Sequence, residues 1–148
     1  MKDMGSCKYL LDSNICIHLL RGRKDVYEQL LQVEWKNCCI SEITVIELLY
    51  GAECSNAPDE NREEVLSFCT DLEVISISGC IMDFVRLKAY LRKRGNMIDD
   101  FDLLIGATAI ANGLILVSEN EKHFVRIPEI KLENWVNVSI RTNAPFTP

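Results

Sequence analysis

The feature that most constrains this chain is a regular alternation of short apolar runs with longer segments whose apolar residues recur at helical spacing. Four runs are short and unbroken enough to be buried strands, and a fifth is expected near the end: residues 8–11, 37–41, 73–78, 114–118 and 130–135. Such strands, each followed by a helix, predict βα units joined by right-handed crossovers. We therefore expect an α/β fold, a three-layer α/β/α sandwich with a central, mostly parallel sheet.

The expected helices are bounded by residues that favour helix ends. Ser13 or Asn14 can cap a first helix, which Gly22 ends, and Ser41 can cap a later one. The helices are expected over residues 13–20, 25–35, 41–56, 59–70, 80–94 and 99–112.

The composition is that of one globular domain without a membrane span. The chain has 148 residues, of which 48% are apolar and 26% charged, enough for a sizeable core in a single domain. No apolar run approaches the roughly 18 residues that cross a bilayer, and the N-terminus lacks the long apolar segment of a signal peptide. We expect a cytoplasmic protein with one folded domain over residues 1–136 and a polar, extended tail over residues 137–148.

The cysteines and histidines exclude several kinds of site. The seven cysteines are odd in number and scattered, and none forms a C-x-x-C motif. This spacing argues against a disulfide framework or a zinc ribbon and favours buried thiols in a reducing compartment. His18 and His123 are the only histidines, which leaves little material for a histidine-rich zinc site or a Ser-His-Asp triad.

Acidic residues fall at or near the carboxyl ends of the expected strands, where open parallel sheets bind ligands. They come from four separate parts of the chain: Asp12; Glu47; Asp99, Asp100 and Asp102; Glu119 and Glu121. If the strands are parallel, carboxylates that are distant in the sequence converge on one edge of the sheet.

Bringing carboxylates together is electrostatically costly. Two of them about 4 Å apart repel by roughly 4 kcal/mol at an effective dielectric constant near 20. A protein can relieve this repulsion by protonating one carboxylate or by binding a cation. Oxygen ligands with almost no His or Cys nearby suit Mg²⁺ or Mn²⁺ better than zinc. The cluster therefore predicts phosphodiester hydrolysis by a metal-activated water.

Each acid also has a simpler structural explanation. Asp12, taken alone, is best explained as a helix cap, and Asp99 and Asp102 stand at N-cap and N3 spacing. Glu47 could be a solvated helix residue, but its apolar neighbours place it at the edge of the core, where an unpaired charge is costly. Glu119 and Glu121 could be solvent-exposed residues of a polar loop. The predicted convergence favours Asp12 as a metal-binding carboxylate and leaves helix capping to the two residues that follow it.

A net charge of −6 argues against a broad basic surface for nucleic acid but allows a local basic patch. The run from Arg86 to Arg94 holds five cations. It is either a solvated face with favourable charge at a helix C-terminus or a strip that contacts a nucleic-acid backbone beside the acids. Arg86, Lys93 and Arg94 are the candidate nucleic-acid contacts, and residues 21–24 form a second basic candidate.

Four blocks of the sequence, in order and spacing, resemble the VapC toxins of the PIN-domain family. They are YLLDSNICIHLLRG, ISEITVIELLYGAECS, DDFDLLIGATAIANGLILVSEN and RIPEIKLENW, and they cover residues 9–135. The resemblance implies a PIN-like fold and a metal-dependent endoribonuclease that is the toxin of a type II toxin–antitoxin pair, with Mg²⁺ or Mn²⁺ as its cofactor.

The resemblance also implies roles for individual residues. Asp12, Glu47 and Asp102 match the family's catalytic, metal-binding acids, and Ser13 matches a supporting hydroxyl residue. A further family acid follows the strand at 114–118, and the residue aligned with it is Asn120. Asp100 matches a position that is often acidic, and Glu119 or Glu121 are candidates to replace the acid missing at Asn120.

The family resemblance implies three partners: an RNA substrate, which could be structured as in a tRNA, a cognate antitoxin that blocks the acidic groove, and a second copy in a homodimer. Two alternatives stay open. One is a degenerate PIN-like module that binds RNA or antitoxin without cleavage, favoured by Asn120. The other is a phosphatase that begins with a strand-end Asp, disfavoured because Asn14 occupies the position of its second Asp.

Overall fold

The computed structural model describes residues 7–136 and contains one parallel sheet. Its strands lie in the order β3-β2-β1-β4-β5, and every neighbouring pair is parallel. The strands are β1 (Tyr9–Leu11), β2 (Cys38–Ser41), β3 (Glu73–Ile75), β4 (Ile115–Val117) and β5 (Lys131–Glu133). From β1 the chain first adds strands on one side and later returns to add β4 on the other. A crevice therefore opens between the carboxyl ends of β1 and β4, the switch point at which such sheets bind ligands.

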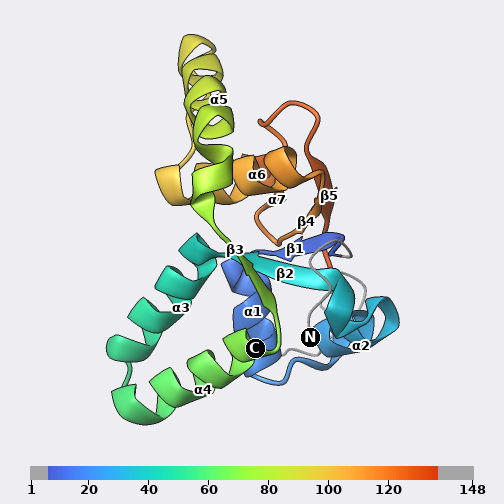
Figure 1. Cartoon of the computed structure of the whole chain (residues 1–148), viewed down its shortest axis with the longest axis vertical. Coiled ribbons are helices and arrows are strands. Elements are labelled where there is room, and N and C mark those ends of the chain that lie inside the picture. The colour runs from blue at the N-terminus through green and yellow to red at the C-terminus, as the bar shows by residue number, and fades with distance from the viewer. Residues whose placement is uncertain (1–6, 137–148) are drawn as a thin grey trace, which may run out of the picture.

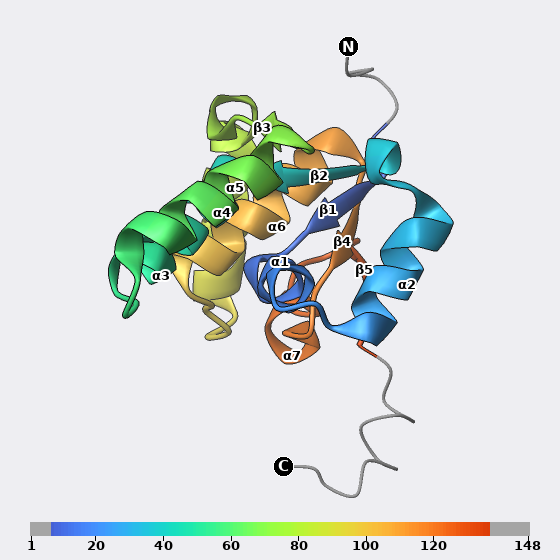
Figure 2. The ribbon, with the colours of Figure 1, turned by 90° about the horizontal axis from the view of Figure 1, so that it is seen from below.

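Helices cover both faces of the sheet, which confirms the predicted three layers (Figure 1). One layer holds α1 (Ser13–Leu20), α2 (Lys24–Val33), α3 (Glu42–Glu53) and α4 (Pro58–Thr70), and Figure 2 shows these helices over the sheet from their own side. The other layer holds α5 (Ile81–Lys93), α6 (Asp100–Asn112) and α7 (Glu121–Phe124), with α5 standing away from the sheet. None of the helices among the described residues is long and apolar enough to cross a membrane.

The core divides in two because successive strand residues point to opposite faces. Leu11, Ile40 and Val117 are fully buried against the layer of α1 to α4. Leu10 and Leu116, the residues just before two of these in the chain, are fully buried against α5, α6 and α7. Burial on both faces explains why these strands are unbroken apolar runs rather than alternating ones.

Several expected elements differ from the structure in their bounds. The helix expected over 25–35 ends at Val33, because Glu34 takes a positive φ of 75° and a 3-10 helix, η1 (Trp35–Asn37), follows. The strand expected over 73–78 stops at Ile75, because the Ser76 hydroxyl caps a second 3-10 helix, η2 (Ile77–Cys80). The segment around His123, where no helix was expected, forms the short helix α7. The tail expected over 137–148 lies outside the described residues.

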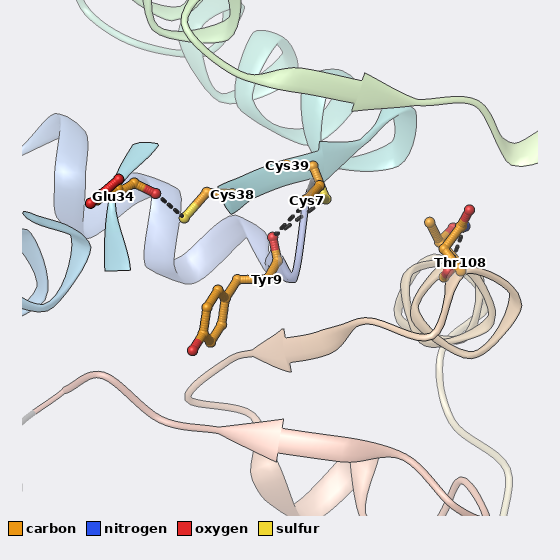
Figure 3. The surroundings of a disulfide bond; sticks show 7 residues. Cys7, Tyr9, Glu34, Cys38, Cys39 and Thr108 are labelled. Carbon is orange, nitrogen blue, oxygen red and sulfur yellow. Dashed lines mark hydrogen bonds between the residues drawn. A yellow bond between two sulfur atoms is a disulfide. The ribbon is translucent and has the colours of Figure 1, made fainter. Parts of the chain in front are cut away.

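A disulfide joins Cys7, just before β1, to Cys39 on β2, with the two Cα atoms 6.2 Å apart (Figure 3). Both sulfur atoms lie beside the Tyr9 carbonyl oxygen, at 3.6 and 3.4 Å. The prediction that the cysteines are thiols is therefore wrong for this pair, because the parallel pairing of β1 with β2 brings together residues that are far apart in the sequence. Cys16, Cys38 and Cys80 are buried free thiols, as expected.

Two glycines test the backbone conformations assigned to the end of α6 and the interior of α3. Gly113 ends α6 in the left-handed conformation, with φ 63°, whereas Gly51 lies within α3 and a Cβ added there meets nothing within 4 Å. Gly113→Ala should destabilise the protein by about 1 kcal/mol, and Gly51→Ala should stabilise it by about 0.5–1 kcal/mol. Urea unfolding of both variants checks this. Equal signs for the two changes would contradict the assigned helix end.

Candidate active site

Asp12 lies at the switch point and is only 4% exposed. Because Leu11 pairs with Val117, the residues that follow them, Asp12 and Ser118, lie side by side where β1 and β4 end. One Asp12 oxygen accepts a hydrogen bond from the Ser13 amide at 2.8 Å, and the other accepts from the Ser118 hydroxyl at 2.7 Å and the Asn14 side chain at 3.3 Å. The strand end thus fixes this carboxylate from several directions.

Asp12 is also the N-cap of α1, so the expectation that Ser13 or Asn14 caps this helix is wrong. Its backbone is extended, with φ −71° and ψ 161°, while Ser13 is already helical. An extended residue before the first helical turn is the one whose side chain meets the free amides. One oxygen of Asp12 therefore caps the helix while the other belongs to the site.

Glu47 enters the crevice from α3 and is held by Ser13. The Ser13 hydroxyl makes a short hydrogen bond to the Glu47 carboxylate and lies 3.3 Å from the Thr44 hydroxyl. The helix that carries Glu47 starts where predicted, because the Ser41 hydroxyl accepts a hydrogen bond from the Ile43 amide. Ser13 therefore connects the first two acids.

Asp102 lies in the first turn of α6, whose N-cap is Asp99. The Asp99 carboxylate accepts from the amides of Phe101 and Asp102, at 3.1 and 3.4 Å, so its predicted capping role is confirmed. The Asp102 carboxylate accepts a hydrogen bond from the Asn120 side chain at 3.1 Å. His123 adjoins both, with Nδ1 2.8 Å from the Asn120 amide nitrogen and 3.4 Å from the Asp102 oxygen.

The pKa of each of the three acids is raised in the folded protein. Burial raises the pKa of Asp12 to about 6, with a smaller contribution from the charges of Asp102 and Glu47, although hydrogen bonds from Ser118 and Ser13 oppose the rise. Burial raises the pKa of Glu47, against the Ser13 hydrogen bond, and the charges of Asp102 and Asp99 add to it. Burial also raises the pKa of Asp102, and the charge of Asp99 adds to the rise. The crevice therefore holds negative charge that a bound cation would stabilise.

Other predicted site residues have different neighbours. Asp100 pairs with Lys88 at 3.0 Å, Glu119 makes a short contact with His18, and Glu121 accepts a hydrogen bond from Asn134 at 3.2 Å. The Asn120 side chain, in contrast, donates its hydrogen bond to Asp102. Arg86 and Lys93 are exposed on α5, and the Arg94 guanidinium lies 4.2 Å from the Tyr90 ring centroid.

Sequence reasoning did not assign Ser118 or His123 to the site. Ser118 is a fully buried hydroxyl at the end of a strand, and its position one residue after a buried apolar run was the available signal. His123 lies three residues after Asn120, at helical spacing, which places both on one side of α7.

The donors suit a hard divalent cation in kind, since Asp12, Glu47 and Asp102 offer carboxylate oxygens. Among residues 7–136, however, no three His, Cys, Asp or Glu side chains come close enough together to hold a metal ion directly. Mg²⁺ usually binds through one or two carboxylates and keeps several waters. The cluster therefore fits an ion held by one or two of its carboxylates, with the remainder reaching it through water.

Burial of Asp12 predicts a pH-dependent cost in stability. Its pKa of about 6 in the folded protein lies above the ordinary 3.8, so stability falls as pH rises from about 4 to 6 and the cost is complete above pH 6. Asp12→Asn should therefore stabilise the metal-free protein by about 1–2 kcal/mol at pH 7.5, less than the full shift because Asn has one acceptor oxygen. The gain should vanish near pH 4.

Urea unfolding at both pH values measures this difference. Asp71→Asn, a matched change at an exposed residue before β3, should alter stability by less than about 0.5 kcal/mol at either pH. If Asp12→Asn instead lowered the free energy of unfolding at pH 7.5, the buried Asp12 carboxylate would not destabilise the metal-free protein.

Comparison with known proteins agrees with this geometry. A family model described as PIN domain matches residues 9–130. The tRNA(fMet)-specific endonuclease VapC of Salmonella typhimurium is 33% identical over 129 residues, which cover 86% of this chain and 98% of that protein. Ribonuclease VapC2 of Rickettsia felis is 38% identical over 130 residues, which cover 86% and 97%.

Solved structures share the fold. The DNA-bound VapBC of Salmonella typhimurium matches with a TM-score of 0.82 and 34% identity, covering 87% of this chain and 98% of that one. VapBC2 of Rickettsia felis, bound to a promoter DNA fragment, matches with a TM-score of 0.78 and 36% identity, covering 86% and 98%. With a strand-end Asp, a helical Glu and a helix-start Asp in one crevice, this chain belongs to the PIN-domain family and, within it, to the VapC ribonucleases.

Proposed function

We propose that this protein is the toxin of a type II toxin–antitoxin pair, an endoribonuclease that hydrolyses RNA phosphodiester bonds with Mg²⁺ or Mn²⁺ in the cytoplasm. The observation that carries the proposal is the convergence of Asp12, Glu47 and Asp102 in the crevice at the ends of β1 and β4. Membership of the VapC ribonucleases supports the same reaction.

The three acids have distinct tasks in this proposal. Asp12 and Asp102 hold the divalent ion, directly or through its waters, and Glu47 on α3 completes the set. Ser13 and Ser118 orient the Glu47 and Asp12 carboxylates by hydrogen bonds. A bound divalent ion would supply a water of lowered pKa and offset the charge that develops on the phosphate.

Arg86, Lys93 and Arg94 on α5 are the proposed RNA contacts. Arg86 and Lys93 stand seven residues apart on α5, so they share one exposed face of that helix, and on the same helix Lys88 pairs with Asp100 at the start of α6. The Salmonella relative is named as specific for tRNA(fMet). We propose a structured RNA, such as a tRNA, as the substrate class.

The proposed protein partners are a cognate antitoxin and a second copy of the chain. The VapBC structures that resemble this chain support the first. A groove of about 270 Å³ between α1, α3 and α4, lined by Ile17, Arg21 and Glu47, would admit an antitoxin segment that blocks Glu47. The exposed apolar residues Ile81, Met82 and Val85 on α5 offer a surface for a homodimer.

Removing an acid tests the reaction. Asp12→Asn and Asp102→Asn should each lower RNA cleavage by at least a hundredfold, because each removes a charge that binds the ion, and EDTA should abolish wild-type cleavage. Purified, antitoxin-free protein with labelled RNA and Mn²⁺ is the assay, and Asp71→Asn, at the opposite edge of the sheet, is the matched control. Cleavage that survives in either acid variant would refute the assignment.

A non-catalytic, RNA- or antitoxin-binding module is the second candidate, favoured by Asn120 in place of an acid. Calorimetry separates the two functions. Antitoxin binding with no measurable Mn²⁺ binding supports the binding module, whereas Mn²⁺ binding that Asp12→Asn removes supports the nuclease.

The basic strip predicts a change in RNA affinity alone. The double variant Arg86→Gln, Lys93→Gln should raise KM several-fold, leave kcat within about twofold, and reduce the slope of log K against log salt by about 1 to 2. Salt-dependent RNA binding measures the slope. An unchanged slope would exclude the strip as an RNA contact.

A further inference from the structure

The segment after β4 offers Asp102 an amide and an imidazole. The Asn120 side chain donates to Asp102 at 3.1 Å, and the same amide nitrogen lies 2.8 Å from His123 Nδ1. The Asn120 backbone amide donates to the Ser118 hydroxyl at 2.8 Å, and that hydroxyl donates to Asp12. Asn120 thus lies between Asp12 and Asp102, two acids that are far apart in the sequence.

The distances assign donor and acceptor within this group. An amide NH₂ has two protons and no acceptor. With one proton directed at Asp102, the other meets His123 Nδ1, which must then be the unprotonated ring nitrogen. The 2.8 Å contact is also shorter than the 3.4 Å from Nδ1 to Asp102, which favours acceptance from Asn120 over donation to the carboxylate.

Burial of the next residue keeps His123 in place. Phe124 is fully buried in the core layer of α6 and α7. Its ring lies 3.6 Å from the position that a Cβ on Gly106 would occupy. This close approach packs α7 against α6, whose first turn contains Asp102. The His123 side chain stays about half exposed, at 45%.

We propose that Asn120 and His123 form one positioning unit, in which His123 orients the Asn120 amide and the amide orients the Asp102 carboxylate toward the divalent ion. This inference rests on the proposed metal-dependent function. A fourth carboxylate in this place would add repulsion to a cluster that already holds three. An amide oriented by the imidazole ring fixes Asp102 without adding a negative charge.

Affinity for Mn²⁺ in the absence of RNA tests the unit, because partners that orient a ligating carboxylate typically change metal affinity about 10–100-fold. His123→Ala should weaken Mn²⁺ binding by at least about tenfold. His123→Asn, whose side-chain oxygen lies near the Nδ1 position, should stay within about threefold of wild type. Val125→Ala, at an exposed residue on the same turn, is the matched control and should bind normally.

Coupling between the two residues gives a second measurement. If they act as one unit, Asn120→Ala with His123→Ala should weaken Mn²⁺ binding no more than Asn120→Ala alone. Additive losses, or normal binding by His123→Ala, would overturn the proposal. If His123→Ala does not fold, His123→Gln replaces it: Gln has no acceptor at the Nδ1 position, so Mn²⁺ binding equal to that of His123→Asn would also overturn it.

The ring nitrogen shifts test the unit without metal. In ¹⁵N NMR spectra of the metal-free protein at pH 8, His123 should carry its proton on Nε2, with Nδ1 unprotonated. A protonated Nδ1 would refute the hydrogen-bond assignment whether or not the protein is a nuclease. Absence of Mn²⁺ binding by the wild type, in contrast, would refute the proposed function and with it the role of the unit.

Discussion

The hydrogen bond from Ser118 to Asp12 is the contact on which the rest of the site depends. It forms because β1 and β4 pair in parallel with Leu11 opposite Val117, so the next residue of each strand emerges at the same edge. The Ser118 hydroxyl also accepts a hydrogen bond from the Asn120 backbone amide, and the Asn120 side chain donates one to Asp102. A shift of this register by one residue would turn Asp12 to the other face of the sheet and separate it from the remaining acids.

The buried carboxylate of Asp12 lowers the stability of the fold but suits the proposed function. Asp12 is almost completely buried beside other carboxylates, and its raised pKa measures the cost of keeping it charged. The protein offsets this cost in part with hydrogen bonds and in part with the N-terminus of α1, which Asp12 caps. A rigid carboxylate with unbalanced charge suits a cation site better than an optimally stable core, as expected where activity and stability are in conflict.

Much of this could be predicted from the sequence, and the limits have physical causes. Unbroken apolar runs and caps such as Ser41 are local signals, so the layers and most helix starts were predictable. The pairing of Cys7 with Cys39 and the hydrogen bond from Ser118 to Asp12 depend on how distant elements pack, which periodicity does not encode. Asp12 lies at the end of β1, as predicted, but its capping role was given to its neighbours because one carboxylate can serve both tasks.

The central claim is that the crevice confines negative charge that a divalent ion stabilises. Carbon-13 NMR titration of the Asp12 carboxyl group, in metal-free and Mg²⁺-saturated protein, tests it most directly. The account predicts a pKa of about 6 for Asp12 in the metal-free protein and a fall well below that value with Mg²⁺, because a bound cation favours the ionised form. A pKa near 3.8 that Mg²⁺ leaves unchanged would contradict it.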